Sequence, residues 1–140
     1  MMGQIELQRV DYMPAELSAG ILYVSERYKT AIHLCPCGCN SKIVTPLEPT
    51  EWTFVADDEK PTLYPSLGNW QLPCRSHYWI FDGKIEWSFQ WSEKQIEAGR
   101  RIEERRTKRY FDDIEKKNRK KRVIGKIVNW LLNRRIDCGP

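Results

Sequence analysis

Residues 78–89 read YWIFDGKIEWSF, and they carry the strongest local structural signal in the chain. The central Asp82-Gly83 is favoured in two-residue type I′ turns, so the stretch predicts a β-hairpin. Such a turn sets Phe81 opposite Lys84, Ile80 opposite Ile85, Trp79 opposite Glu86 and Tyr78 opposite Trp87. In the second arm apolar and polar residues alternate as far as Trp91, which is typical of a half-buried strand. One face of the hairpin should meet a core and the other should meet water.

Short apolar runs earlier in the chain predict further strands. Residues 20–24, 30–34, 42–47 and 52–55 are rich in β-branched and aromatic residues. Between the second and third of these runs lies CPCGCN, residues 35–40, a turn-forming sequence that should form the tip of a hairpin. Residues 57–60 are charged, and with Pro61 they should form an exposed connection.

The character of the chain changes at Ser92. Ser92 and Gln95 resemble an N-terminal capping box, and five pairs of opposite charge follow at helical spacing. The pairs are Glu97/Arg101, Glu104/Lys108, Asp112/Lys116, Asp113/Lys117 and Glu115/Arg119. Residues 123–132 then show apolar positions at helical spacing, which predicts a second, short amphipathic helix. The predicted fold is a small α+β protein, mainly β, with a β domain over residues 1–91 and two C-terminal helices over residues 92–140.

Composition fits one small domain. The 140 residues are 41% hydrophobic, enough for one modest core. No apolar run approaches the roughly 18 residues of a membrane span, and no leader pattern is visible, so we expect a cytoplasmic protein that does not enter a membrane. The formal charge of +4 is unevenly spread, because residues 93–122 hold 13 Lys/Arg and 7 Asp/Glu.

The cysteines predict a metal site. Five is an odd number, and the three that crowd into residues 35–39 are badly placed to pair as disulfides. Several thiols with one imidazole best match a single tetrahedral zinc, and a full set of protein ligands makes it structural. The candidate ligands are Cys35, Cys37, Cys39, Cys74 and His77. One of the three clustered cysteines is expected to be a spectator, and Cys138 is expected to be an exposed tail thiol. The alternative is a set of reduced cysteines that pack as small apolar residues.

Candidate catalytic residues are fewer. Ser66 and Ser76 are the hydroxyls closest in sequence to the cysteines, and a nucleophilic serine needs a base within hydrogen-bond reach. Extending the hairpin register puts Ser76 and His77 on opposite faces, so His33 is the better partner for either serine. His33 could equally be a further ligand or a packed residue.

Six cations in residues 116–122 suggest an anion-binding segment. They are Lys116, Lys117, Arg119, Lys120, Lys121 and Arg122. Such a cluster draws phosphates, so nucleic-acid binding by the helix is one possible function. The alternative is a solvated helix face.

Four motifs carry a resemblance to a known family. In order along the chain they are HLCPCGC (33–39), PSLGNW (65–70), CRSHYWI (74–80) and GKIEW (83–87). Together they resemble a bacterial family of unknown function, domain family 6527, over about residues 3–91. Its members are similar in being small cysteine-rich proteins, often encoded beside ubiquitin-like, ubiquitin-activating-like and ubiquitin-conjugating-like proteins, in operons suspected of phage defence. Asn40 stands where the family is expected to have glycine, which a left-handed turn position would tolerate.

The resemblance implies a zinc-binding accessory component of a bacterial ubiquitin-like conjugation pathway, with those proteins as partners. It is compatible with a peptidase that processes or deconjugates the ubiquitin-like protein, through Ser66 or Ser76 with His33. It is also compatible with a non-enzymatic, ligase-like adaptor and with a purely structural subunit.

Overall fold

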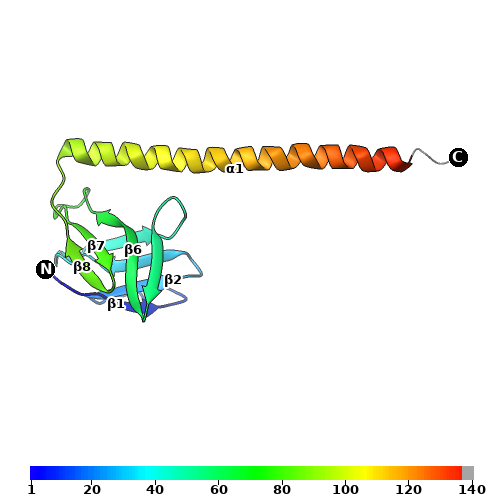
Figure 1. Ribbon diagram of the computed structural model, residues 1–140. Coiled ribbons are helices and arrows are strands. Elements are labelled where there is room, and N and C mark those ends of the chain that lie inside the picture. The colour runs from blue at the N-terminus through cyan, green and yellow to red at the C-terminus, as the bar shows by residue number, and fades with distance from the viewer. Residues whose placement is uncertain (137–140) are drawn as a thin grey trace. The chain divides into compact units, whose positions relative to one another are not determined.

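The computed structural model describes residues 1–136, and the side chains of residues 1–134 (Figure 1). Within these residues the chain forms eight strands and one helix. The strands are β1 (Glu6–Arg9), β2 (Ile21–Ser25), β3 (Thr30–Leu34), β4 (Lys42–Pro46), β5 (Thr53–Asp57), β6 (Lys60–Gly68), β7 (His77–Phe81) and β8 (Lys84–Trp87), and the helix is α1 (Glu93–Ile136). Cys138 lies outside the described residues. The prediction of a mainly β protein is confirmed.

The strands form two four-stranded sheets, ordered β1-β2-β3-β4 and β5-β6-β7-β8. Neighbours are antiparallel except for β1, which runs parallel to β2. Strand β1 was not predicted, because its sequence, ELQR, has a single aliphatic residue and three of its four residues are exposed. It lies at the sheet edge, where little burial is needed.

The hairpin of β7 and β8 has the predicted register at all four positions. The φ values of Asp82 and Gly83 are 49° and 72°, and positive values at both turn positions are the signature of a type I′ turn. Strand β8 ends at Trp87, earlier than the alternation suggested, and the Phe89 side chain is 91% exposed.

A second tight hairpin joins β5 to β6 where the sequence suggested a longer connection. Asp57 pairs with Lys60, and Asp58 and Glu59 between them have φ values of 49° and 58°. Because the two left-handed positions are occupied by acidic residues and not by glycine, this turn could not be predicted from the sequence.

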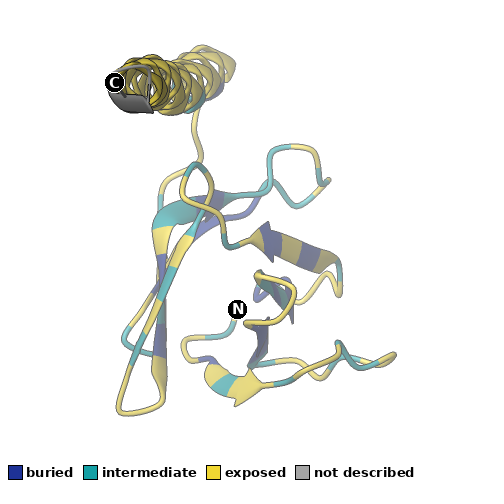
Figure 2. Ribbon diagram, turned by 90° about the vertical axis from the view of Figure 1, so that its right-hand side faces the viewer, coloured by how far each residue is buried: buried dark blue, intermediate teal, exposed yellow. Residues whose placement is uncertain are grey.

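The core lies between the inward faces of the two sheets (Figure 2). Leu22, Val24 and Ile43 come from the first sheet, and Leu63, Tyr78 and Ile80 from the second. Burial of each large apolar side chain stabilises such a fold by about 1.5–3 kcal/mol. The core therefore joins both hairpin systems into one unit.

The prediction of two C-terminal helices is wrong, since α1 is one continuous helix over residues 93–136. Its predicted capping box is confirmed: the Ser92 amide donates to Gln95 Oε1 at 2.8 Å, and the Gln95 amide donates to Ser92 Oγ at 3.4 Å. The change from charged to apolar residues at Val123 brings neither a proline nor a cap, so nothing there ends a helix.

The chain divides into two compact units, one ending at Glu97 and one beginning at Ala98. We call residues 1–97 the β unit; it includes the first turn of α1, where Ile96 is buried. Across residues 1–136, no helix has both the length and the apolar character needed to cross a bilayer.

Candidate functional site

Ser66 and His77 meet across two neighbouring strands. Strand β6 pairs with β7 through Leu67 opposite Tyr78 and Gly68 opposite His77, so Ser66 is a diagonal neighbour of His77. The Nε2 atom of His77 lies 3.0 Å from the Oγ atom of Ser66. This is hydrogen-bond distance for an imidazole and a hydroxyl.

An irregularity in β6 places Ser66. The register shifts between Leu63, which pairs with Ile80, and Leu67, which pairs with Tyr78, so four steps along β6 match two along β7. The irregular stretch includes the cis Tyr64–Pro65 peptide bond. Bulged strands are a common means of aiming a side chain next to a functional site. Here the extra residues carry Ser66 to the imidazole.

The other ring nitrogen of His77 fixes the tautomer. Its Nδ1 atom lies 3.1 Å from the main-chain oxygen of Phe89. A carbonyl oxygen only accepts hydrogen bonds, so Nδ1 carries the hydrogen, and Nε2 of the neutral ring presents a lone pair. The Ser66 hydroxyl therefore donates to Nε2. A hydroxyl that donates to an imidazole oriented from behind is the arrangement of an activated nucleophile.

Two tryptophans enclose the imidazole. The His77 ring centroid lies 4.9 Å from that of Trp70 and 5.0 Å from that of Trp91. The two indoles stack on each other at 5.6 Å, and His77 is only 4% exposed. Gly68 permits this packing, because a Cβ atom there would lie 2.5 Å from the Trp70 ring. The rings restrict the orientation of His77 and its access to water.

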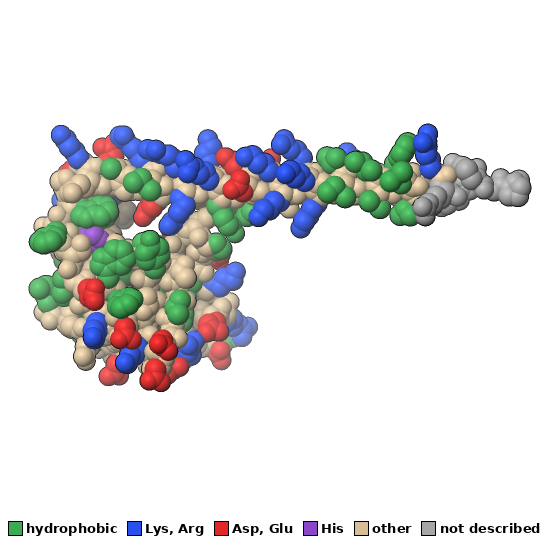
Figure 3. Space-filling model, in the orientation of Figure 1, with side chains coloured by type: hydrophobic (Ala, Val, Ile, Leu, Met, Phe, Trp, Pro, Cys, Tyr) green, Lys and Arg blue, Asp and Glu red, His purple; other side chains and the backbone are tan. Residues whose placement is uncertain are grey.

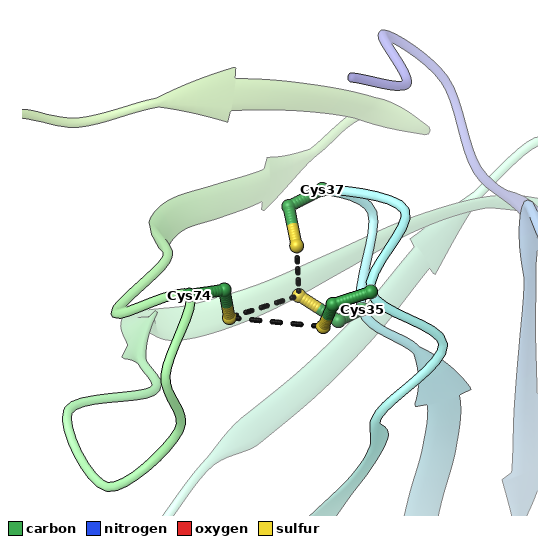
Figure 4. Close-up of side chains that lie close together, drawn as sticks. Cys35, Cys37 and Cys74 are labelled. Carbon is green, nitrogen blue, oxygen red and sulfur yellow. Dashed lines mark hydrogen bonds between the residues drawn. The ribbon is translucent and has the colours of Figure 1, made fainter.

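Four thiols form a second cluster. Cys35, Cys37 and Cys39 come from the connection between β3 and β4, and Cys74 comes from the connection between β6 and β7. Figure 4 shows the side chains of Cys35, Cys37 and Cys74 directed toward one another. All four sulfurs lie within 4.8 Å of one another, and none of these cysteines is in a disulfide.

The spacing of the sulfurs suits a tetrahedral metal ion. Zinc–sulfur bonds of about 2.3 Å put the sulfurs of a tetrahedral site about 3.8 Å apart. Cys35 Sγ lies 3.3 Å from Cys37 Sγ and 4.0 Å from Cys74 Sγ, and Cys39 Sγ lies 3.7 Å from Cys74 Sγ. The four cysteines could therefore hold one thiophilic ion and leave no open position.

Local backbone geometry presents the first three thiols on one tight turn. Gly38 and Asn40 have φ values of 92° and 58°, so Asn40 occupies a left-handed position of the kind that tolerates asparagine in place of glycine. Burial raises the pKa of the Cys35 thiol to about 12, whereas the hydrogen bond between the Cys39 thiol and the Ser41 hydroxyl lowers the pKa of Cys39 to about 6. Binding of a cation would favour the thiolate form of all four.

The structure places the remaining candidate residues as follows. His77, a predicted ligand, is engaged with Ser66 and Phe89, and the group of described residues that could hold a metal contains the four cysteines without it. His33 is fully buried, and its Nε2 atom lies 2.8 Å from the Tyr78 hydroxyl. Burial lowers the pKa of His33 to about 4.

Ser76 Oγ accepts from Asn69 Nδ2 at 2.7 Å and lies 3.2 Å from Cys35 Sγ. The structure thus brings Ser66 to His77, and it directs His33 and Ser76 to other partners.

One loop serves both groups. Residues 69–76 are closed by a hydrogen bond from the Asn69 amide to the Ser76 carbonyl at 2.9 Å. This loop carries Trp70, which packs on His77, and Cys74, which belongs to the thiol cluster. The two sites are therefore connected through a few residues of main chain.

The fold and the site define a small β protein that combines a serine–histidine pair with a four-thiol cluster. A family model described as bacterial ubiquitination-like system serine protease (BubE) matches residues 9–88. The chain belongs to this family, and the link to ubiquitin-like conjugation systems expected from the four sequence motifs is confirmed. No curated protein and no solved structure was found to match the chain.

Sequence reasoning missed the pairing of Ser66 with His77. The spacing Cys74-x2-His77 resembles a pair of zinc ligands, and for this reason His77 was predicted to be a metal ligand. A usable signal was the predicted hairpin register, which already put His77 on the face opposite Ser76 and Tyr78. The main-chain acceptor at Phe89 leaves no side-chain signal at all.

Proposed function

We propose that this protein is a serine protease of a bacterial ubiquitin-like conjugation pathway, with Ser66 as nucleophile and His77 as general base. The observation that carries the proposal is the chain of contacts from Ser66 Oγ to His77 Nε2 at 3.0 Å and from His77 Nδ1 to the Phe89 carbonyl at 3.1 Å. The family description, a serine protease, supports the same assignment.

The reaction follows from the geometry. Ser66 Oγ attacks the carbonyl carbon of the bound peptide bond while its proton passes to His77 Nε2. As the tetrahedral intermediate collapses, the C–N bond breaks and Nε2 returns the proton to the leaving amine. Water then attacks the acyl ester and gives a proton to Nε2. When this second tetrahedral intermediate collapses, the bond to Ser66 Oγ breaks, Nε2 returns the proton to Oγ, and the product leaves as a carboxylic acid that ionises in water. The Phe89 carbonyl accepts from Nδ1–H throughout and stabilises the imidazolium.

We assign the substrate as the C-terminal bond of the pathway's ubiquitin-like protein, either in a precursor with an extension or in a conjugate. The family description names a ubiquitination-like system, which supports a substrate within it. The ubiquitin-activating-like and ubiquitin-conjugating-like proteins of the pathway would then act on the free C-terminus that cleavage produces.

We assign one zinc ion to Cys35, Cys37, Cys39 and Cys74, in a structural role. Four protein ligands close a tetrahedral site, whereas catalytic zinc keeps a position for water. The ion would join the β3–β4 turn to the loop of residues 69–76 and so support a small core. No step of the reaction passes through it.

The test uses the zinc-loaded chain and a ubiquitin-like protein with a C-terminal extension, read by intact mass. The wild-type chain should remove the extension, and Ser66→Ala and His77→Ala should each lower the rate by on the order of 10³-fold or more. Ser76→Ala is the matched control and should cleave at close to the wild-type rate. Cleavage that survives Ser66→Ala would overturn the assignment. No cleavage by a wild-type chain that retains its metal would favour a non-enzymatic adaptor.

Nucleic-acid binding stays a prediction for the cationic segment. All six cations of residues 116–122 are exposed on α1, which favours contact with phosphates. Binding that falls steeply with salt and is lost when the six are neutralised would support this second function.

A further inference from the structure

The outer face of the β5–β8 sheet carries an apolar surface. Val55, Tyr64, Trp79 and Phe81 lie on it, with exposed fractions of 57%, 60%, 36% and 57%. Figure 3 shows hydrophobic side chains gathered near a histidine on one side of the β unit. Large apolar side chains grouped on a surface commonly mark a place where another molecule binds.

Register puts this surface on the same side as the serine–histidine pair. In β7, Tyr78 is buried, so His77 and Trp79 on either side of it both point outward. Tyr64 contacts Trp79, with ring centroids 6.0 Å apart, just as Ser66 contacts His77. The Tyr64–Trp79 row is therefore the next row of the sheet after the row that holds the reacting groups.

Phe81 forms the following row. It pairs with Lys84, as Trp79 pairs with Glu86, so charged residues of β8 flank the aromatic rings on one side. On the other side, Val55 continues the apolar row onto β5, where it pairs with Thr62. We call Tyr64, Trp79 and Phe81 the aromatic face.

Dimensions of the sheet set which part of a substrate would reach the aromatic face. Successive outward residues of a strand are about 7 Å apart, as are alternate residues of an extended peptide. A chain held at Ser66 would therefore lay its second residue from the cleaved bond near Tyr64 and Trp79. Its fourth residue would lie near Phe81.

We propose that the aromatic face binds bulky apolar side chains of the polypeptide substrate, with the main contact made by the residue two positions from the cleaved bond. The inference rests on the proposed protease function. The surface begins one row from Ser66, and tyrosine and tryptophan are the side chains that contribute most to such contacts. Selectivity is for large apolar over acidic residues at that position, because a carboxylate there would lose its hydration against the rings and meet their negative faces.

The experiment separates the chemistry from the selection of substrate. Labelling of the chain by a small fluorophosphonate, read by intact mass, reports the reactivity of Ser66 without reaching the aromatic face. Cleavage of a randomised peptide library, read by mass spectrometry, reports the residues preferred around the cleaved bond. The kcat/KM of the best peptide is then compared with that of its partner carrying glutamate at the second position.

Trp79→Ala and Tyr64→Ala should each lower kcat/KM for the apolar peptide by about tenfold or more and flatten the preference over the glutamate peptide. Fluorophosphonate labelling should stay at the wild-type rate. Tyr28→Ala is the matched control, because Tyr28 is an exposed aromatic residue in the β2–β3 turn of the other sheet. Phe81→Ala changes a third position of the aromatic face that is more exposed than Trp79, so it still tests the proposal if the Trp79 variant does not fold.

Full labelling with unchanged kcat/KM and unchanged preference in all three variants would overturn the inference and leave the protease function standing. A wild-type chain that is neither labelled nor active on any peptide would instead remove the proposed function, and this inference with it.

Discussion

His77 is oriented by a main-chain carbonyl, where a carboxylate holds the histidine in many serine hydrolases. The acceptor belongs to the backbone, so it does not depend on the identity of residue 89. A carbonyl also stabilises the imidazolium less than a full negative charge would. The pair is thus built from one side-chain contact and one backbone contact.

The Phe89 side chain should be dispensable for the chemistry. Phe89→Ala keeps the carbonyl that accepts from His77 Nδ1, and the side chain that it removes is 91% exposed. Labelling by fluorophosphonate should therefore stay within about threefold of wild type, while His77→Ala should abolish it. Loss of labelling in Phe89→Ala with an intact fold would show that the side chain positions the histidine.

The packing of Trp70 requires a glycine at position 68. A Cβ atom at this position would meet the Trp70 ring at 2.5 Å, so Gly68→Ala should displace the indole that covers His77. We expect a loss of about 1–3 kcal/mol in the free energy of unfolding and a larger relative loss of activity. Denaturant unfolding measures the loss of stability, tryptophan fluorescence reports the displaced indole, and fluorophosphonate labelling measures the loss of activity. Gly3→Ala is the control, since a Cβ atom there meets nothing within 4 Å.

His33 makes stability depend on pH. Burial lowers its pKa to about 4 in the folded chain, against about 6.5 when unfolded. Between these values the unfolded state binds more protons, so stability rises with pH up to about 6.5 and is unaffected by this group above it. From pH 7.5 to pH 5.5 the wild type should lose roughly 1 kcal/mol that His33→Phe does not lose. Unfolding of both zinc-loaded proteins at both pH values measures the difference, and equal losses would contradict it.

At the scale of elements, strong local signals were predictable from the sequence. The Asp82-Gly83 turn fixed the register of β7 and β8, and Ser92 with Gln95 marked the start of α1. The contact between Ser66 and His77 was not predictable, because it depends on the shifted register of β6 opposite β7. No local sequence pattern predicts how many extra residues a β-bulge contains. The cluster of four cysteines, by contrast, could be predicted from residue type alone.

The single helix has a direct test at Gly125. This glycine lies inside α1 with open space around it, so an added methyl group meets nothing. Gly125→Ala should stabilise the helix by about 1 kcal/mol and raise helicity in circular dichroism. Unchanged helicity would argue that the helix is already interrupted at this position.

For the whole molecule, metal stoichiometry distinguishes the two roles considered for His77. Zinc bound by the four cysteines predicts one equivalent per chain in elemental analysis. Cys74→Ser should lose that equivalent and lower the melting temperature, because removal of a structural metal removes folding free energy. His77→Ala should keep it, since its ring contacts Ser66 and Phe89. Loss of zinc from His77→Ala would return the histidine to the ligand set.

The loop of residues 69–76 would couple the proposed protease activity to the proposed zinc ion. Trp70 covers the histidine from one end of this loop, and Cys74 anchors the other end in the thiol cluster. In a chain without the ion, Trp70 would cover His77 from a loop whose other end, at Cys74, is not fixed by a metal. Metal binding would then be a maturation step: without the ion the proposed protease would be inactive, and binding of the ion would complete the site.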